Sequence, residues 1–279
     1  MKKLFLTVAA ILAIAFISGC SGSPDDNGGG SKNTNTITQK TIKDAPDAVG
    51  DIVLKDGKAI AYYDGLTLTD QEKADAIAVI FYAGGNSELG DRILGVGLYE
   101  YYHTRSYYTK GSNTSGTKFN AANDETNGLN NQQVMENYSD YKEEYQLDFE
   151  DFDDFDNSKY PAFHWAENYY DCEGVDIPWD NNPNALCKNW YVPAKKELSA
   201  LLKKNAVINK VFDKISNNAV KFGNKSYWSS TTANIHCVLD SYDNDYYYAW
   251  IQGINNSNVQ EPEPIEKERS FAVRVIRAF

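Results

Sequence analysis

The stretch from Ile235 to Asn258 carries the residue types best suited to recognising another molecule, because it is rich in Tyr, Asn and Asp. Tyr supplies a large contact area at low cost in conformational entropy, and Asn and Ser supply adaptable hydrogen bonds, as in antibody loops. We therefore expect non-catalytic binding of an extracellular protein or glycan. The candidate ligand-binding residues are His236, Asp240, Tyr242, Asn244, Tyr246, Tyr248, Trp250, Gln252, Asn255 and Asn256.

The alternation of apolar and polar side chains predicts which residues of this stretch face outward. If Ala249 and Ile251 face the core of a strand, the side chains between them face outward, because successive side chains point to opposite faces. Large rings on an exposed strand face often mark a binding site. The outward set is Tyr246, Tyr248, Trp250 and Gln252. The alternative is a Tyr-rich sheet packed under loops.

No catalytic or metal-binding pattern stands in the chain. It holds only three histidines and lacks the H-E-x-x-H, P-loop, G-x-S-x-G and paired C-x-x-C motifs. We expect no enzyme activity, no cofactor and no metal site. The acidic run 148–156 could hold calcium, but a solvated acidic face with Phe anchors is the favoured interpretation. A net charge of −12 argues against nucleic acid as a partner.

The N-terminus predicts a lipid-anchored protein of the cell envelope. Lys2 and Lys3 precede the apolar run Leu4 to Ile17, which is short for a membrane span. Residues 17–20, Ile-Ser-Gly-Cys, resemble a bacterial lipobox, which implies cleavage before Cys20 and a membrane anchor through lipid on that cysteine. An ordinary cleaved signal peptide is the alternative. We expect a signal peptide over 1–19, a flexible tether over 20–48 and one domain over 49–279.

The three cysteines beyond Cys20 allow one disulfide and one free thiol in an oxidising compartment. A pair between Cys172 and Cys187 would close a short loop and is the favoured connectivity. The alternative is that all three are buried thiols that pack as small hydrophobes.

Local sequence patterns predict a hairpin, a helix and two buried strands before residue 99. Asp56-Gly57 predicts a tight hairpin turn between strands over 52–54 and 59–62. Thr69 and Glu72 form a capping-box pattern, and the helix after it is expected to carry Ala74, Ile77 and Ala78 as an apolar stripe. Buried strands are predicted at Val79–Tyr82 and Leu94–Leu98, with the glycines of the latter indicating close backbone packing.

The patterns after residue 99 predict mostly helices. A helix is expected from Pro161 to about Tyr170, another from Pro193, and a third with apolar residues at helical spacing over 208–215. Residues 99–159 are polar with few apolar anchors, so they are interpreted as a long insertion. Alternation at 271–276 predicts a closing strand. Together these signals predict an α+β domain.

Three motifs give a family resemblance over roughly Gly50 to Phe279. They are W-x-x-P-x-x-x-E-L at 190–198, Y-W-S-S at 227–230 and V-R-V-I-R-A-F at 273–279. Their order is similar to that of DUF1566-type domains of the C-type-lectin fold, formylglycine-generating-enzyme-like subtype. With the apolar runs 78–82 and 94–98 and Tyr-Pro-Ala-Phe at 160–163, it resembles spirochaete surface lipoproteins of the Treponema variable protein group.

The resemblance implies a surface lipoprotein of the outer membrane whose C-terminal stretch is in some relatives rewritten by a diversity-generating retroelement, mainly at Asn codons. It also leaves two rival functions open. One is a structural or immune-facing coat lipoprotein without a ligand. The other is an envelope enzyme of the formylglycine-generating type, which is disfavoured because Cys237 has no nearby cysteine to complete that metal site.

Overall fold

A computed structural model describes most of the scaffold. The described residues are 39–85, 88–101, 122–135, 161–167, 169, 189–216, 219–233, 248–266 and 269–279. The chain divides into two units, Met1–Thr36 and Ile37–Phe279, and every described residue belongs to the second. The predictions on the lipobox, the Cys172–Cys187 pair and the acidic run 148–156 fall outside the described residues. Within them, no helix combines the length and apolar character needed to span a bilayer.

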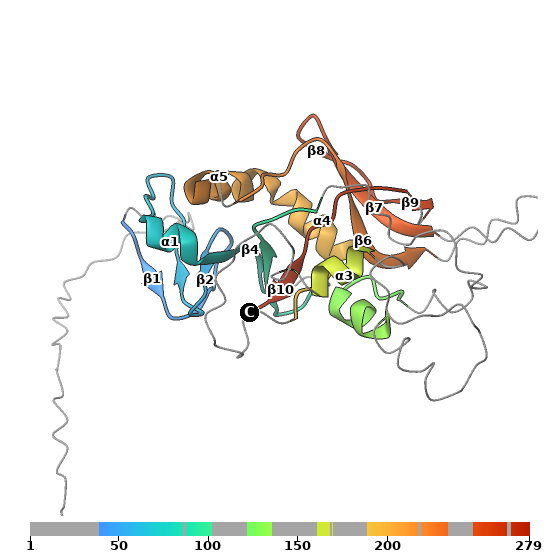
Figure 1. Ribbon diagram of the computed structural model, residues 1–279, viewed down its shortest axis with the longest axis horizontal. Coiled ribbons are helices and arrows are strands. Elements are labelled where there is room, and N and C mark those ends of the chain that lie inside the picture. Colours follow the sequence, from blue (N-terminus) through green and yellow to red (C-terminus); the bar gives the residue numbers. More distant parts are fainter. Residues whose placement is uncertain are drawn as a thin grey trace, which may run out of the picture. The chain divides into compact units, whose positions relative to one another are not determined.

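The first of two antiparallel sheets has six strands (Figure 1). Its order is β1-β3-β2-β4-β5-β10. The strands are β1 (Ile42–Lys43), β2 (Ile52–Leu54), β3 (Ala59–Ile60), β4 (Ala76–Ala83), β5 (Ile93–Gly97) and β10 (Ile276–Ala278). The hairpin predicted at Asp56-Gly57 is confirmed: β2 and β3 pair across it, and Gly57 has a φ of 85°, which favours glycine.

Helix α1 (Asp70–Asp75) begins with the predicted capping box, in which Thr69 and Glu72 each accept a hydrogen bond from the other's backbone N–H. The expected apolar stripe is wrong. The backbone becomes extended at Ala76, so Ile77 and Ala78 lie in β4, and Ala74 is exposed. A short apolar run has no periodicity that distinguishes helix from strand, and in the structure it is part of strand β4.

A second antiparallel sheet is built from β6 (Ser226–Ala233), β7 (Tyr248–Asn255), β8 (Asn258–Val259) and β9 (Glu263–Glu266). Strand β7 lies between β6 and β9. The closing segment 271–279 reaches both sheets: Trp228 N–H donates to Ala272 C=O at 2.9 Å, and Ile276 pairs with Val96 of β5. Residues 272–276 are all buried, so the last motif of the chain is core scaffold.

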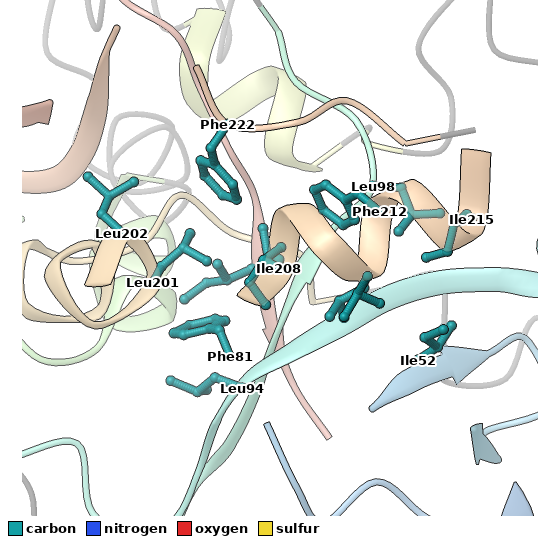
Figure 2. Close-up of a cluster of buried hydrophobic side chains, with 14 of the residues drawn as sticks. Ile52, Phe81, Leu94, Leu98, Leu201, Leu202, Ile208, Phe212, Ile215 and Phe222 are labelled. Carbon is teal, nitrogen blue, oxygen red and sulfur yellow. The ribbon is translucent and has the colours of Figure 1, made fainter. Parts of the chain in front are cut away.

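Three further helices are α3 (Pro161–Glu167), α4 (Lys195–Lys203) and α5 (Asn205–Ile215), and residues 128–135 are also helical. Each buries apolar side chains, and in α5 these are the residues predicted at helical spacing, Ile208, Val211, Phe212 and Ile215. The side chains of α4 and α5 pack against those of β4 and β5 in one cluster (Figure 2). It includes Phe81, Leu94, Leu201, Leu202, Ile208, Phe212 and Ile215. The coarse prediction of an α+β fold is therefore confirmed.

Two predicted boundaries change. The tether was expected to run to residue 48, but Ile42 and Lys43 already pair with β3, so residues 39–48 belong to the folded unit. The insertion predicted over 99–159 contains a structural part. Residues 128–135 are helical, and Ala122 and Met135 are buried in the core. A two-residue strand and a polar helix both lack the apolar periodicity that would reveal them in a sequence.

Candidate ligand-binding face

The glutamate of the first motif, Glu197, is a fully buried centre of hydrogen bonding. Its carboxylate accepts from Arg92 Nη1 at 2.7 Å, Gly128 N–H at 2.9 Å, Ala194 N–H at 2.8 Å and Tyr191 OH at 3.1 Å. Burial raises the pKa of the Glu197 carboxyl, against the opposing effect of these donors. These five residues, the Glu197 hub, join the segment just before β5, the 128–135 helix and the N-terminus of α4, so the motif serves structure.

The first arginine of the closing motif is also structural. Arg274 has no exposed surface, and its guanidinium lies 3.1 Å from the equally buried Glu100 carboxylate. It also donates to the carbonyl of Val220 and stacks on Phe222, with its guanidinium carbon 4.4 Å from the ring centroid. Lys225 supplies the second cation to Glu100 at 2.5 Å. The Arg274–Glu100 pair is buried in the core and offers no surface to a ligand.

The N-terminus of α4 is fixed by a polar loop. Lys195 N–H donates to Thr231 Oγ1 at 2.9 Å, and Lys196 N–H donates to the carbonyl of Glu125 at 2.8 Å. The Asp124 carboxylate holds this loop, because it accepts from the backbone of Thr126 at 2.8 Å. Ala194 has no capping side chain, so neighbouring segments satisfy the orphan donors of the helix. The side chains of Lys195 and Glu125 therefore leave from well-defined backbone positions.

Partly exposed rings lie on β7 beside this helix end. Tyr248 and Trp250 are two residues apart, so they point to one side of the sheet. Their cross-strand partners on β9 are Glu266 and Pro264, which share that side. We name these four residues the aromatic face. Ala249 and Ile251 are buried on the other side, which confirms the predicted alternation.

Lys195 covers part of the aromatic face. Its ammonium lies 4.1 Å from the centroid of the Trp250 ring and 2.6 Å from Glu125 Oε1. The neighbouring Lys196 pairs with Glu88 at 2.8 Å, and this carboxylate raises the pKa of Lys196 above its usual value. The indole ring thus contacts a cation that a carboxylate also holds.

The outward exposure predicted for Gln252 is wrong. Gln252 lies on the predicted side of β7 but is only 4% exposed, because α4 covers this end of the strand. Ser199 Oγ donates to Gln252 Oε1 at 2.7 Å, and Gln252 Nε2 donates to the carbonyl of Gln260 at 2.8 Å. Both ends of the amide are occupied, so Gln252 fastens α4 to β7 and offers no group to a ligand.

Asn255 and Asn256 are exposed, but they lie apart from the rings. They form the tip of the β7–β8 hairpin, where Asn256 and Ser257 have φ values of 47° and 66°. Asn255 lies five positions after Trp250 along the strand, a distance of about 17 Å. The described candidates therefore form two patches divided by Gln252. The other five, His236, Asp240, Tyr242, Asn244 and Tyr246, lie outside the described residues.

Two residues near the aromatic face were missed at the sequence level: Lys195, which contacts the Trp250 ring, and Glu125, which pairs with Lys195. Lys195 was assigned only to a helix, and Glu125 to a polar insertion. Neither position shows a periodic signal, since their proximity to Trp250 depends on how α4 packs on β7. Among the described residues, no group of three His, Cys, Asp or Glu side chains is placed to hold a metal ion.

Comparisons with known proteins give a fold likeness. No family model matches the chain, and no curated protein matches it. Among solved structures, a crystal structure of a fimbrial protein from Bacteroides ovatus is similar, with a TM-score of 0.50 and 18% identity. The likeness covers 83% of this chain and 49% of that one, so the chain spans about half the length of the structure it matches. At this identity the likeness concerns the fold alone.

Proposed function

We propose that the chain is a lipid-anchored protein of the cell envelope that binds an extracellular ligand without catalysis, through the aromatic face. The observation that carries the proposal is the pair of partly exposed rings of Tyr248 and Trp250 on one side of β7. Exposed aromatic side chains contribute strongly to binding energy, because they bury a large area with few rotatable bonds.

The charged residues of the sequence motifs are unsuited to ligand binding, which supports the aromatic face as the site. Glu197 and Arg274, the charged residues of the two most distinctive motifs, are buried and paired within the core. Tyr248 and Trp250 instead combine surface exposure with a rim of charges from Lys195 and Glu266. Among the described residues, this face therefore has the properties expected of a ligand site.

The envelope location is supported by the lipobox-like residues 17–20 and by the likeness to a fimbrial protein. The motifs at 190–198, 227–230 and 273–279 support the finer fold assignment, a C-type-lectin-like domain of the formylglycine-generating-enzyme-like subtype. We extend the proposal to retroelement diversification of the C-terminal stretch. A near-copy of the DNA encoding Trp228 to Phe279, differing chiefly at adenines and lying beside a reverse transcriptase, would support that extension. Absence of such a copy would remove it.

The binding proposal is tested with the purified full chain on arrays of extracellular-matrix proteins and glycans. The test variant is Tyr248→Ala with Trp250→Ala. The matched control is Ile42→Ser, because Ile42 is 56% exposed on β1 of the other sheet. We expect wild type and control to bind the same ligand and the double variant to lose it. Binding that survives in the double variant contradicts the site.

The likeness to a fimbrial protein favours one second candidate, a structural subunit of the cell surface with no separate ligand. That candidate predicts that neither wild type nor any variant binds a component of the array. It also predicts that the double variant leaves surface assembly unchanged. Wild-type binding that the double variant loses favours the binding candidate, and surface assembly that depends on neither ring favours the structural one.

A further inference from the structure

Lys195 occupies a cation site made by the protein itself. Its ammonium lies 4.1 Å from the centroid of the Trp250 ring and 2.6 Å from the Glu125 carboxylate. An aromatic ring carries negative charge on its face, so an ammonium or guanidinium there is attracted to it. The internal contact shows that this ring, as the fold presents it, accommodates a positively charged side chain.

The surroundings add negative charge to the rings. Glu266 lies directly across from Tyr248 on β9 and shares its side of the sheet. Arg269 lies 3.6 Å from Glu266 and offsets part of its charge, but both side chains are exposed, so the pair is weak and a partner's cation can compete for Glu266. The whole chain has a net charge of −12. An anionic ligand would meet repulsion here, whereas a basic one would meet complementary charge.

We propose that the aromatic face binds a basic segment of a partner protein, with a lysine or arginine side chain of the partner on the ring of Trp250 and against Glu125 or Glu266. Lys195 is then an internal competitor that the partner's side chain displaces or joins. This inference rests on the proposed function, because it uses the same face and specifies the chemistry of the partner.

The first test is a titration of the full chain with two decapeptides, one alternating lysine and serine and one alternating glutamate and serine. We expect the basic peptide to bind and the acidic peptide not to bind. Trp250→Leu leaves the net charge unchanged, so general attraction between opposite charges persists in it. Loss of the ring contact should weaken the affinity for the basic peptide about five-fold or more. Ile42→Ser should bind like wild type.

The second test removes the internal competitor. Lys195→Gln frees the Trp250 ring and leaves the Glu125 carboxylate without its closest cation. We expect the basic peptide to bind about three-fold to ten-fold more tightly to this variant, since one positive charge is removed from the site itself. Equal affinity of wild type and Trp250→Leu for the basic peptide overturns the inference, and so does equal binding of the two peptides.

The array and the peptides separate two kinds of failure. If an array ligand depends on Tyr248 and Trp250 while the basic peptide shows no dependence on Trp250, the inference is wrong and the proposed function stands. A neutral glycan as that ligand leads to the same conclusion. If neither the array ligand nor the peptide depends on the rings, both proposals are wrong.

Discussion

The Glu197 hub and the Lys195–Glu125 pair beside the aromatic face both join a carboxylate to a cation, yet they differ in exposure. Glu197 is 0% exposed and takes four donors, whereas Glu125 is 41% exposed in its side chain and pairs with Lys195 beside Trp250. A buried charge that loses its partner stays costly, while an exposed one is solvated by water. The hub therefore maintains the fold, and the face can exchange its internal contact for an external one.

The largest effect is expected at the hub. Glu197→Ala leaves the Arg92 guanidinium and two backbone N–H groups without their acceptor. We expect the free energy of unfolding, measured by urea denaturation, to fall by about 3–5 kcal/mol. Glu125→Ala is the matched control and should cost about 1 kcal/mol or less. Equal losses in the two variants would contradict the contrast between hub and face.

Two tryptophans on neighbouring strands sharpen the same comparison. Trp228 of β6 is 0% exposed, and Trp250 of β7 is partly exposed. Thermal or urea unfolding should show a loss of about 3–5 kcal/mol for Trp228→Ala, because truncation leaves a cavity. Trp250→Ala should cost about 1 kcal/mol, mainly the contact with Lys195. A loss for Trp250→Ala as large as that for Trp228→Ala would make Trp250 a core residue.

A smaller loss of stability is expected when a methyl group is added to the closely packed Gly128 of the hub. A Cβ at Gly128 would lie 2.2 Å from the carbonyl oxygen of Val192, so backbone must move to accept it. Gly128→Ala should lower the free energy of unfolding by about 1–3 kcal/mol. At Gly223 the Cβ would meet only Lys225 Cε at 3.6 Å, so Gly223→Ala should change stability by about 0.5 kcal/mol or less. Similar values for both would show that the hub tolerates movement.

The smallest effect is a pH dependence in the loop that positions Lys195. Partial burial raises the pKa of Asp124, but hydrogen bonds from Thr126, Asn127 and Asn130 outweigh it and lower the pKa below its usual value. Asp124 therefore stabilises the fold above about pH 4, the unfolded value, and this stabilisation is lost as the pH falls through the folded pKa. Asp124→Asn should flatten the dependence of unfolding free energy between about pH 5 and pH 3. An unchanged slope would contradict this assignment.

Local patterns were sufficient for much of the fold. The capping box of Thr69 and the hairpin at Gly57 were predicted because their signals lie within four residues. The helix 205–215 was predicted because its apolar periodicity is complete. Ile77 was assigned to the wrong element because a brief apolar run suits a helix or a strand equally.

The candidate site was less predictable than the fold. Alternation identified which side of β7 carries Trp250, but it cannot show that α4 covers Gln252. The contact of Lys195 with Trp250 joins residues far apart in sequence, so only tertiary packing reveals it. Likewise, Glu197 stood out as a motif residue, but its four donors come from three separate segments.

Hydrogen exchange of the full chain, with and without a ligand identified on the array, tests the central claim most directly. The aromatic face predicts slower exchange for amides within 248–251 and 263–266 when the ligand is bound. Exchange within 52–54 and 76–83 should not change, because these strands belong to the other sheet. Protection confined to the six-stranded sheet, with β7 and β9 unaffected, would contradict the claim that this face binds the ligand.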